Sequence, residues 1–241
     1  MLDDIMNRSN SSIYFKNSIP YYDYFFTNKK YNIPELRGLG AKNVFYFKNG
    51  YSLQVHHPLN ISSEDQQFYG CEVTFVGTFE YARSKLINYL AENNIRIKIW
   101  GWGITRKNSG LSDSANITLM DQYVYDEEYA KVISASQINL CFLRKVNRDT
   151  ETTRSIEIPA CKGFMIAERT IEHLELFQEG IEAEYFSSPK ELLEKINYYL
   201  HNTNERIKIA EKGYLKCMSL KLSYHDQLKY IFSIIKDHHN E

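Results

Sequence analysis

The chain has 241 residues, with 29 basic and 30 acidic side chains and therefore a formal net charge of −1. This balance argues against a protein that coats nucleic acid, because phosphate binding needs a basic excess. The apolar content of 43% argues against disorder, no apolar run is long enough for a transmembrane helix, and the acidic start Asp3-Asp4 does not fit a signal peptide. At about 100–200 residues per domain, the length predicts one full domain and an additional segment.

The first quarter of the chain contains three short predicted elements. Residues 1–19 are polar and poorly patterned, and the run 23–27 predicts a buried strand. Residues 31–39 carry a helical pattern with Asn32 as the N-cap and Pro34 in the first turn. Residues 43–47 predict a second strand, and residues 58–65 resemble a linker.

From residue 71 onward, predicted strands alternate with predicted helices. The strands are 71–76, 95–100, 117–120, 137–143, 163–167 and 183–186. The helices are 80–92, 127–136, 154–161, 189–201, 205–218 and 225–238. This alternation predicts an α/β fold, a Rossmann-like parallel sheet with helices on both faces. Ligands of such sheets bind at the carboxyl ends of the strands, so the loops that follow the strands are the functional candidates.

Two compositional features bear on function. The four cysteines form no C-x-x-C pair and no zinc spacing, so we predict no metal site and a reducing, cytoplasmic compartment. The 19 tyrosines admit two explanations, contacts to bases and sugars or the codon usage of an AT-rich genome. Because the tyrosines are spread along the chain, we favour codon usage.

The loop after the first strand of this series begins with Gly77 and Thr78 and carries Arg83 and Lys85. Glycine allows a ligand to approach the backbone, and the two cations suit a diphosphate. The loop is neither a G-x-G-x-x-G nor a Walker A motif. A structural turn with two solvated cations is the alternative that we favour for this stretch alone.

The loop after the strand 137–143 concentrates charge beside a buried run. It contains Arg144, Arg148, Asp149 and Arg154, and Glu157 follows at the start of the next predicted helix. A ligand with phosphate and hydroxyl groups would use that mixture, arginine for phosphate and carboxylate for hydroxyls. A solvated loop is the alternative.

The run INLCFLRKVNRDTETTRSIEIPACKGFMIAERTIEHLELF resembles the C-terminal domain of CgeB-like (spore-maturation type) glycosyltransferases, which are retaining transferases of the two-Rossmann GT-B fold. VTFVGTFEYARSKLINYL resembles the phosphate-loop region of that domain. YYDYFFTNKKYNIPELRGLGAKNVFYFKNGYSLQVHHP resembles the end of the family's N-terminal domain and its hinge.

The resemblance implies roles for individual residues. Related enzymes have a Glu-x7-Glu motif, and Asp149 and Glu157 stand at that spacing, with aspartate in place of the first glutamate. Glu157 would hold the nucleotide ribose, and Asp149 would lie near the donor sugar or its phosphate, so both are the catalytic candidates. Lys85 matches a diphosphate-binding lysine, and Lys162 stands where a glycine is common. The predicted donor-binding residues are Gly77, Thr78, Arg83, Lys85, Arg144, Arg148, Arg154 and Glu157.

The resemblance also implies a division of the chain. Residues 1–56 would be the remnant of an N-terminal acceptor domain, 57–69 a hinge, 70–222 the donor-binding domain and 223–241 a crossover helix. The short first segment would pack on the main domain, pair with a second chain or reflect a truncation. The last helix would expose Leu228, Ile231, Ile234 and Ile235 and favour self-association, which would make the protein a homo-oligomer or bring in a partner chain.

The resemblance implies transfer of a sugar from a UDP- or GDP-type donor to a hydroxyl acceptor, with retention and without a metal or other cofactor. The acceptor is unknown, and nucleic acid is not an expected partner. Two alternatives remain open: a non-catalytic nucleotide- or glycan-binding module, and a generic α/β scaffold whose charged loops only face solvent.

Overall fold

The computed structural model describes residues 4–7, 11–101 and 104–239. The strands are β1 Tyr24–Thr27, β2 Asn43–Tyr46, β3 Val73–Val76, β4 Ile97–Trp100, β5 Ile117–Met120, β6 Ile138–Cys141, β7 Met165–Glu168 and β8 Glu184–Phe186. The α-helices are α1 Ile13–Ser18, α2 Asn32–Gly38, α3 Ser63–Tyr69, α4 Ser84–Glu92, α5 Arg106–Ser109, α6 Asp126–Ala135, α7 Arg154–Ala160, α8 Ile171–Leu176, α9 Pro189–His201, α10 Thr203–Ser219 and α11 Tyr224–His239. The 3₁₀ turns are η1 Ile19–Tyr21, η2 Tyr81–Arg83 and η3 Lys145–Asn147.

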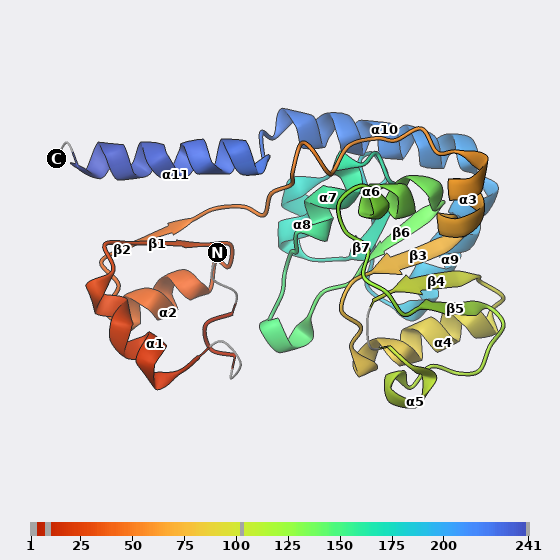
Figure 1. Cartoon of the computed structure of the whole chain (residues 1–241), viewed down its shortest axis with the longest axis horizontal. Helices are drawn as coiled ribbons and strands as arrows, with labels where there is room; N and C mark the ends of the chain where they lie inside the picture. The colour runs from red at the N-terminus through yellow and green to blue at the C-terminus, as the bar shows by residue number, and fades with distance from the viewer. Residues whose placement is uncertain (1–3, 8–10, 102–103, 240–241) are drawn as a thin grey trace.

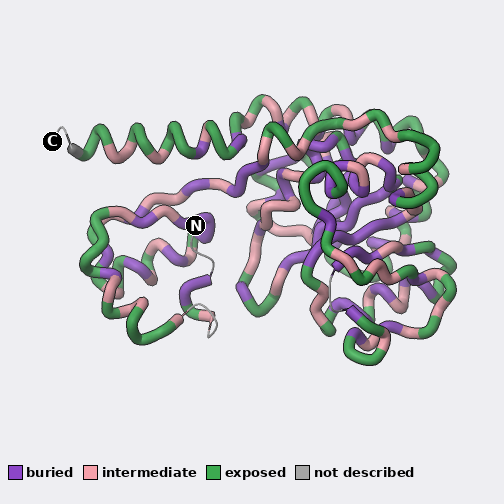
Figure 2. The backbone as a smooth tube through the Cα atoms, viewed as in Figure 1, coloured by how far each residue is buried: buried purple, intermediate pink, exposed green. Residues whose placement is uncertain are grey.

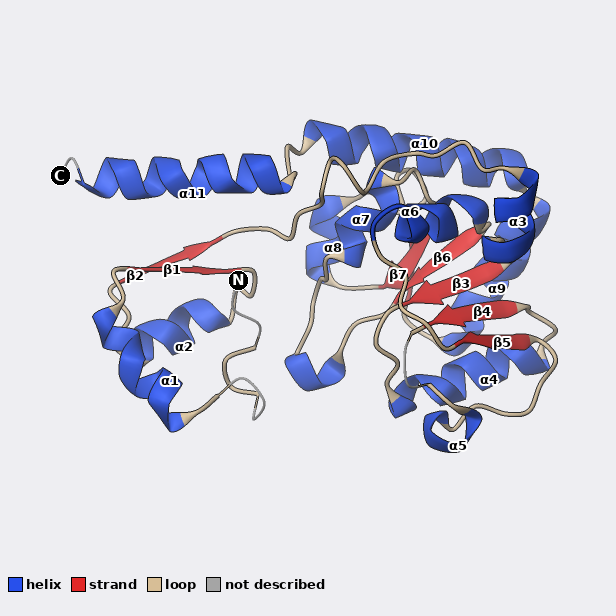
Figure 3. Ribbon diagram, viewed as in Figure 1, coloured by secondary structure: helices blue, strands red, loops and turns tan. Residues whose placement is uncertain are grey.

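The main sheet has six parallel strands in the order β5-β4-β3-β6-β7-β8 (Figure 1). Every residue of β3 and β6 is buried, because helices cover both faces of the sheet. Helices α3, α6 and α7 contribute to the core on one face, and α4 and α9 to the core on the other (Figure 3). The predicted Rossmann-like α/β fold is confirmed. The strand order reverses between β3 and β6, and ligands of such sheets bind at this point.

Residues 4–7 and 11–50 form a small β-α-β unit, in which β1 and β2 are parallel neighbours. Its own core consists of Ile5, Ile19, Phe25, Leu36, Ala41 and Val44. Figure 2 shows buried stretches of chain in this unit, beside the main domain. This unit, which we call the N-terminal unit, contacts the loop after β6, so the first segment packs on the main domain. Within the predicted segments 1–56 and 223–241, residues 1–3, 8–10, 240 and 241 lie outside the described part of the chain.

Several local predictions need correction. Asn32 is the first residue of α2 and not its cap, because its side chain donates to Thr27 Oγ1 at 2.9 Å. Residues 63–69 of the predicted hinge form α3, whose N-cap is Ser62. The predicted helix 80–92 begins as η2 and becomes α-helical only at Ser84. Lys162 adopts a φ of 59°, the left-handed conformation that favours glycine, after the end of α7.

Helix α11 extends from the main domain across the N-terminal unit (Figure 1). The ring of His238 lies edge-on to Tyr24 and Phe45, with centroids 5.8 and 5.4 Å apart. Leu228 is exposed as predicted, whereas Ile231, Ile234 and Ile235 are half-buried. The apolar face of the helix therefore covers this chain's own unit in part. Within the described residues, no helix is both long and apolar enough to span a bilayer.

Candidate functional site

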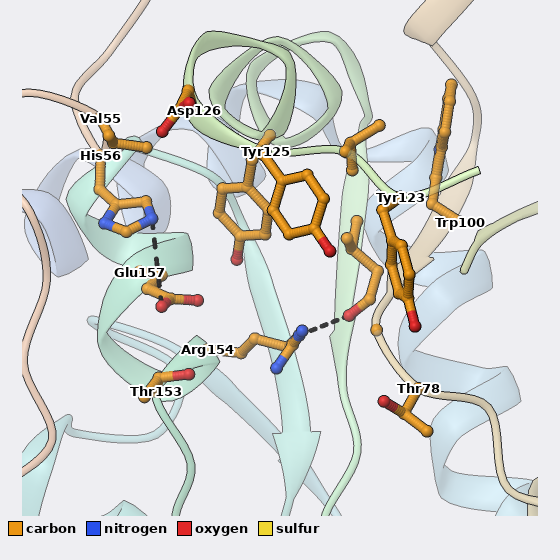
Figure 4. Close-up of a pocket in the computed structure, with 14 residues that line it drawn as sticks. Val55, His56, Thr78, Trp100, Tyr123, Tyr125, Asp126, Thr153, Arg154 and Glu157 are labelled. Atoms are coloured by element: carbon orange, nitrogen blue, oxygen red, sulfur yellow. Dashed lines mark hydrogen bonds and ion pairs between the residues drawn. The ribbon is translucent and has the colours of Figure 1, made fainter. Parts of the chain in front are cut away.

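A cavity of about 340 Å³ lies beyond the carboxyl ends of β3 and β4, beside the point where the strand order reverses (Figure 4). Its walls come from the loop after β3, the loop after β5, the start of α7 and the segment before α3. The lining residues are Val55, His56, Val76, Gly77, Thr78, Trp100, Tyr123, Val124, Tyr125, Asp126, Tyr129, Thr153, Arg154 and Glu157. Of the predicted site residues, the structure brings Gly77, Thr78, Arg154 and Glu157 together here.

Arg154 lies flat against Gly77 at one side of this cavity. Its Nε donates to the carbonyl oxygen of Val76 at 2.5 Å, which fixes the guanidinium at the end of β3. Gly77 has a φ of 144°, and a Cβ atom there would lie 2.9 Å from Arg154 Nη2. Only glycine fits this backbone and this contact. Among the described residues, no carboxylate lies within ion-pair distance of Arg154, so the cavity holds an uncompensated positive charge suited to an anion.

Glu157 follows Arg154 by one turn of α7, and its side chain is 12% exposed. Burial raises the pKa of this carboxyl group, and the positive charge of Arg154 opposes the shift. A ligand hydroxyl that donates to the carboxylate would favour the ionised form further. Glu157 is thus a buried hydrogen-bond acceptor next to an anion site.

His56 contributes a neutral donor to the same cavity. Its Nδ1 accepts the backbone N–H of Ser52 at 3.0 Å, so the neutral ring carries its proton on Nε2. Nε2 lies 4.0 Å from Glu157 Oε1 and faces it (Figure 4). Burial, followed by the charge of Arg154, lowers the pKa of His56 to about 4. Sequence reasoning missed His56, because it lies in the predicted remnant, far along the chain from the strand loops.

Tyrosine side chains form the opposite wall. Tyr123 and Tyr125 follow β5, and their ring centroids lie 5.4 Å apart. Their exposed fractions are 49% and 64%, which leaves their faces open to a planar ligand group. Codon usage, the explanation that we favour for the tyrosine content as a whole, does not predict this wall. The signal that could have found these two residues was their position directly after a predicted strand, at the ligand-binding edge of the sheet.

The two cations predicted in the first loop do not line the cavity. Arg83 is buried, donates to the carbonyl oxygens of Thr78 and Leu143 at 2.6 and 3.2 Å, and lies over the ring of Phe75. These hydrogen bonds hold the loop after β3 in place. Arg83 is therefore not the solvated cation that we expected if this stretch were only a structural turn. Lys85 lies in a separate surface depression beside Lys190.

The charged residues of the loop after β6 interact mainly with other protein groups. Arg144 Nε lies 3.0 Å from Glu80 Oε1. Arg148 pairs with Asp4 and Glu35 of the N-terminal unit, at 2.5 and 2.8 Å. These two predicted donor-binding arginines lie outside the cavity, because their guanidinium groups are directed to carboxylates of the protein.

Asp149 and Glu157 do not share one site, although their spacing suggested it. Asp149 lies 2.5 Å from Lys29 Nζ and accepts the backbone N–H of Arg144 at 3.2 Å. It lines a second, smaller pocket, and Thr153 lines both pockets. Among the described residues, no three histidine, cysteine, aspartate or glutamate side chains gather as metal ligands would.

Residues 83–233 match the model of a family described as glycosyl transferase-like. None of the curated proteins searched matches the sequence.

Solved structures share the fold. HepE of Anabaena in complex with UDP-glucose has a TM-score of 0.70 and 13% identity, over 98% of this chain and 71% of HepE. Sucrose-phosphate synthase of Thermosynechococcus elongatus has a TM-score of 0.66 and 14% identity, over 93% of this chain and 61% of the synthase. A glycosyltransferase of Rickettsia africae has a TM-score of 0.65 and 14% identity, over 94% and 67% of the two chains.

Proposed function

Because the chain belongs to the glycosyl transferase-like family, we propose that the cavity beside Gly77 binds a UDP- or GDP-type sugar donor, and that the protein transfers the sugar to a hydroxyl acceptor. The observation that carries this proposal is the placement of Arg154. It is an uncompensated cation fixed over Gly77 at the ligand-binding edge of the sheet. The UDP-glucose complex of HepE, which shares the fold, supports the choice of donor.

The lining side chains suggest how the donor lies. The diphosphate would contact Arg154 and the backbone of Gly77 and Thr78, because these groups offer positive charge and close approach. The ribose hydroxyls would donate to Glu157, and the base would lie against Tyr123 and Tyr125. The aromatic wall is the one part of this arrangement that the sequence did not predict.

The proposed reaction retains the anomeric configuration and uses no metal. As the bond between sugar and phosphate breaks, negative charge grows on the leaving diphosphate, and Arg154 would stabilise it in place. The CgeB-like subtype is the finer family assignment that we propose, on the motifs around residues 138–170. The four free cysteines support the proposed cytoplasmic location.

One observation favours the alternative of a non-catalytic nucleotide- or glycan-binding module. Asp149, the predicted partner of Glu157, is held by Lys29 and the Arg144 backbone, away from the cavity with Glu157. As a non-catalytic module, the protein would bind the nucleotide sugar without cleaving it.

Turnover of the donor separates these two functions. The whole chain is incubated with UDP-glucose, UDP-galactose, UDP-N-acetylglucosamine and GDP-mannose, and release of the nucleoside diphosphate is measured with and without EDTA. Release that EDTA leaves unchanged supports a metal-independent transferase, and NMR of the product's anomeric proton tests retention. Binding without release supports the module.

A further inference from the structure

A third pocket, of about 260 Å³, lies at the amino-terminal ends of β6 and β7, the edge of the sheet opposite to the cavity beside Gly77. Helix α6 begins at that cavity and ends at this pocket, so the two sites lie at opposite ends of one helix. We call it the α6–α10 pocket. The polar side chains that line it include those of Gln66, Ser134, Ser136, Lys162 and Arg206.

Arg206, at the start of α10, brings a buried positive charge to this pocket. The residue is 8% exposed, and among the described residues no carboxylate forms an ion pair with it. Its Nη1 donates to the carbonyl oxygen of Tyr199 at 2.5 Å, which fixes the guanidinium near the end of α9. A helix end offers only about half a negative charge, so the charge of Arg206 is compensated in part. Lys162, the other cation of the pocket, already pairs with Glu211.

Ser134 and Ser136, at the end of α6, bring two hydroxyl groups to the same pocket. Both Oγ atoms are buried and have no hydrogen-bond partner among the described residues. A buried hydroxyl without a partner costs free energy, and such groups in native proteins usually meet a water, an ion or a ligand. A serine hydroxyl can donate to an anion, whereas it gives a neutral apolar ligand no partner.

The carbonyl oxygens at the end of α6 would oppose an anion if they were free. Two of them already accept hydrogen bonds from side chains. Gln66 Nε2 donates to the carbonyl oxygen of Ala135 at 3.0 Å. Asn139 Nδ2 donates to that of Ile133 at 3.3 Å. The negative end of this helix is therefore partly capped, and the guanidinium of Arg206 remains the main charge facing the pocket.

We propose that the α6–α10 pocket binds an oxyanion, the phosphate or carboxylate group of a small ligand. Arg206 supplies the cation, and the hydroxyls of Ser134 and Ser136 supply further donors. A planar guanidinium suits two oxygens of such a group. The volume is several times the ~30 Å³ that one water molecule occupies in the liquid, which leaves room for more of the ligand than its anionic group. This site is separate from the proposed donor site and does not depend on it.

The test is a calorimetric titration of the whole chain with inorganic phosphate and with acetate, at constant ionic strength. Every protein carries Arg154→Ala, which removes the cation of the cavity beside Gly77, so that an anion bound there does not interfere. Two variants of the pocket are compared with the same changes at exposed positions of α2 and α10: Arg206→Gln with Arg37→Gln, and Ser136→Ala with Ser219→Ala.

We expect at least one of the two anions to bind, and Arg206→Gln to lower its affinity about tenfold or more, while Arg37→Gln leaves it unchanged. Binding of phosphate alone identifies a phosphate-bearing ligand, binding of acetate alone a carboxylate, and binding of both a site for either oxyanion. Ser136→Ala should lower the same affinity several-fold and leave the fold stable, because it removes a hydroxyl without a protein partner.

Ser136→Ala decides the question if Arg206→Gln, which also loses the bond to Tyr199, fails to fold. The inference is overturned if neither anion binds at high millimolar concentration, or if the pocket variants bind as their controls do. Because UDP has no part in these titrations, their result is independent of the proposed function.

Discussion

Lys29 Nζ lies 2.5 Å from Asp149 Oδ1, and both side chains are more than nine-tenths buried. This pair joins the loop after β1 to the loop after β6, across 120 positions of sequence. Tyr46 and Asn49 of the same N-terminal unit bond to Glu151, and Arg148 reaches back to Asp4 and Glu35. The N-terminal unit thus holds the loop that leads into Arg154.

Lys29→Ala is expected to destabilise the protein strongly. It leaves Asp149 buried without its cation, and breaking a buried pair costs about 3–5 kcal/mol. Urea unfolding of the single variant and of Lys29→Ala/Asp149→Ala measures the effect. The double variant should recover part of the loss, because it removes the unpaired charge. Equal stability of Lys29→Ala and wild type would contradict the buried pair.

Gly77→Ala is expected to impair nucleotide binding and stability together. An alanine side chain at this positive φ would strain the backbone by about 1–3 kcal/mol, or its Cβ atom would displace the guanidinium of Arg154. Gly38→Ala is the matched control, since nothing lies within 4 Å of its Cβ position at the end of α2. Thermal unfolding and UDP titration should separate the two variants. A Gly77→Ala protein that behaves like Gly38→Ala would refute the contact.

Glu157→Gln is expected to lower the affinity for UDP, whereas Glu151→Gln is expected to lower the stability of the fold. Glu157 lines the large cavity, so its change should weaken UDP binding by about 1.5–3 kcal/mol, the range for hydrogen bonds to charged groups. Glu151 is buried and accepts from Tyr46 and Asn49, so its change should lower stability and leave UDP affinity intact. Calorimetry and urea unfolding of both variants test the contrast. Equal losses of affinity would count against the ribose role of Glu157.

His56 should make stability fall in mild acid. The folded protein holds its pKa at about 4, below the ordinary 6.5, so the unfolded chain binds the extra proton between these values. The free energy of unfolding therefore decreases as pH falls from about 6.5 toward 4. His56→Asn should show a smaller decrease over the same pH range. Urea unfolding of both proteins at pH 7, 5.5 and 4 gives the difference. A difference that stays constant with pH would exclude a buried neutral His56.

The sequence predicted the parts of this molecule that depend on local pattern. Mostly apolar runs such as those at β3 and β6 identify interior strands, and the residues that directly follow them, such as Gly77, fall at the ligand-binding edge. Helix α3 was missed because a polar seven-residue segment with a serine cap resembles a linker. The contacts of His56 with Glu157 and of Lys29 with Asp149 join distant segments, and no periodicity encodes them.

The proposed donor site is tested most directly by a calorimetric titration of UDP into the whole wild-type chain and into Arg154→Ala, with Lys85→Ala as control. Arg154 lines the cavity and Lys85 does not. We expect wild type and Lys85→Ala to bind UDP with the same affinity, and Arg154→Ala to lose about 1–3 kcal/mol of binding free energy. Binding that Arg154→Ala leaves unchanged, or no binding by wild type at millimolar UDP, would contradict the proposed donor site.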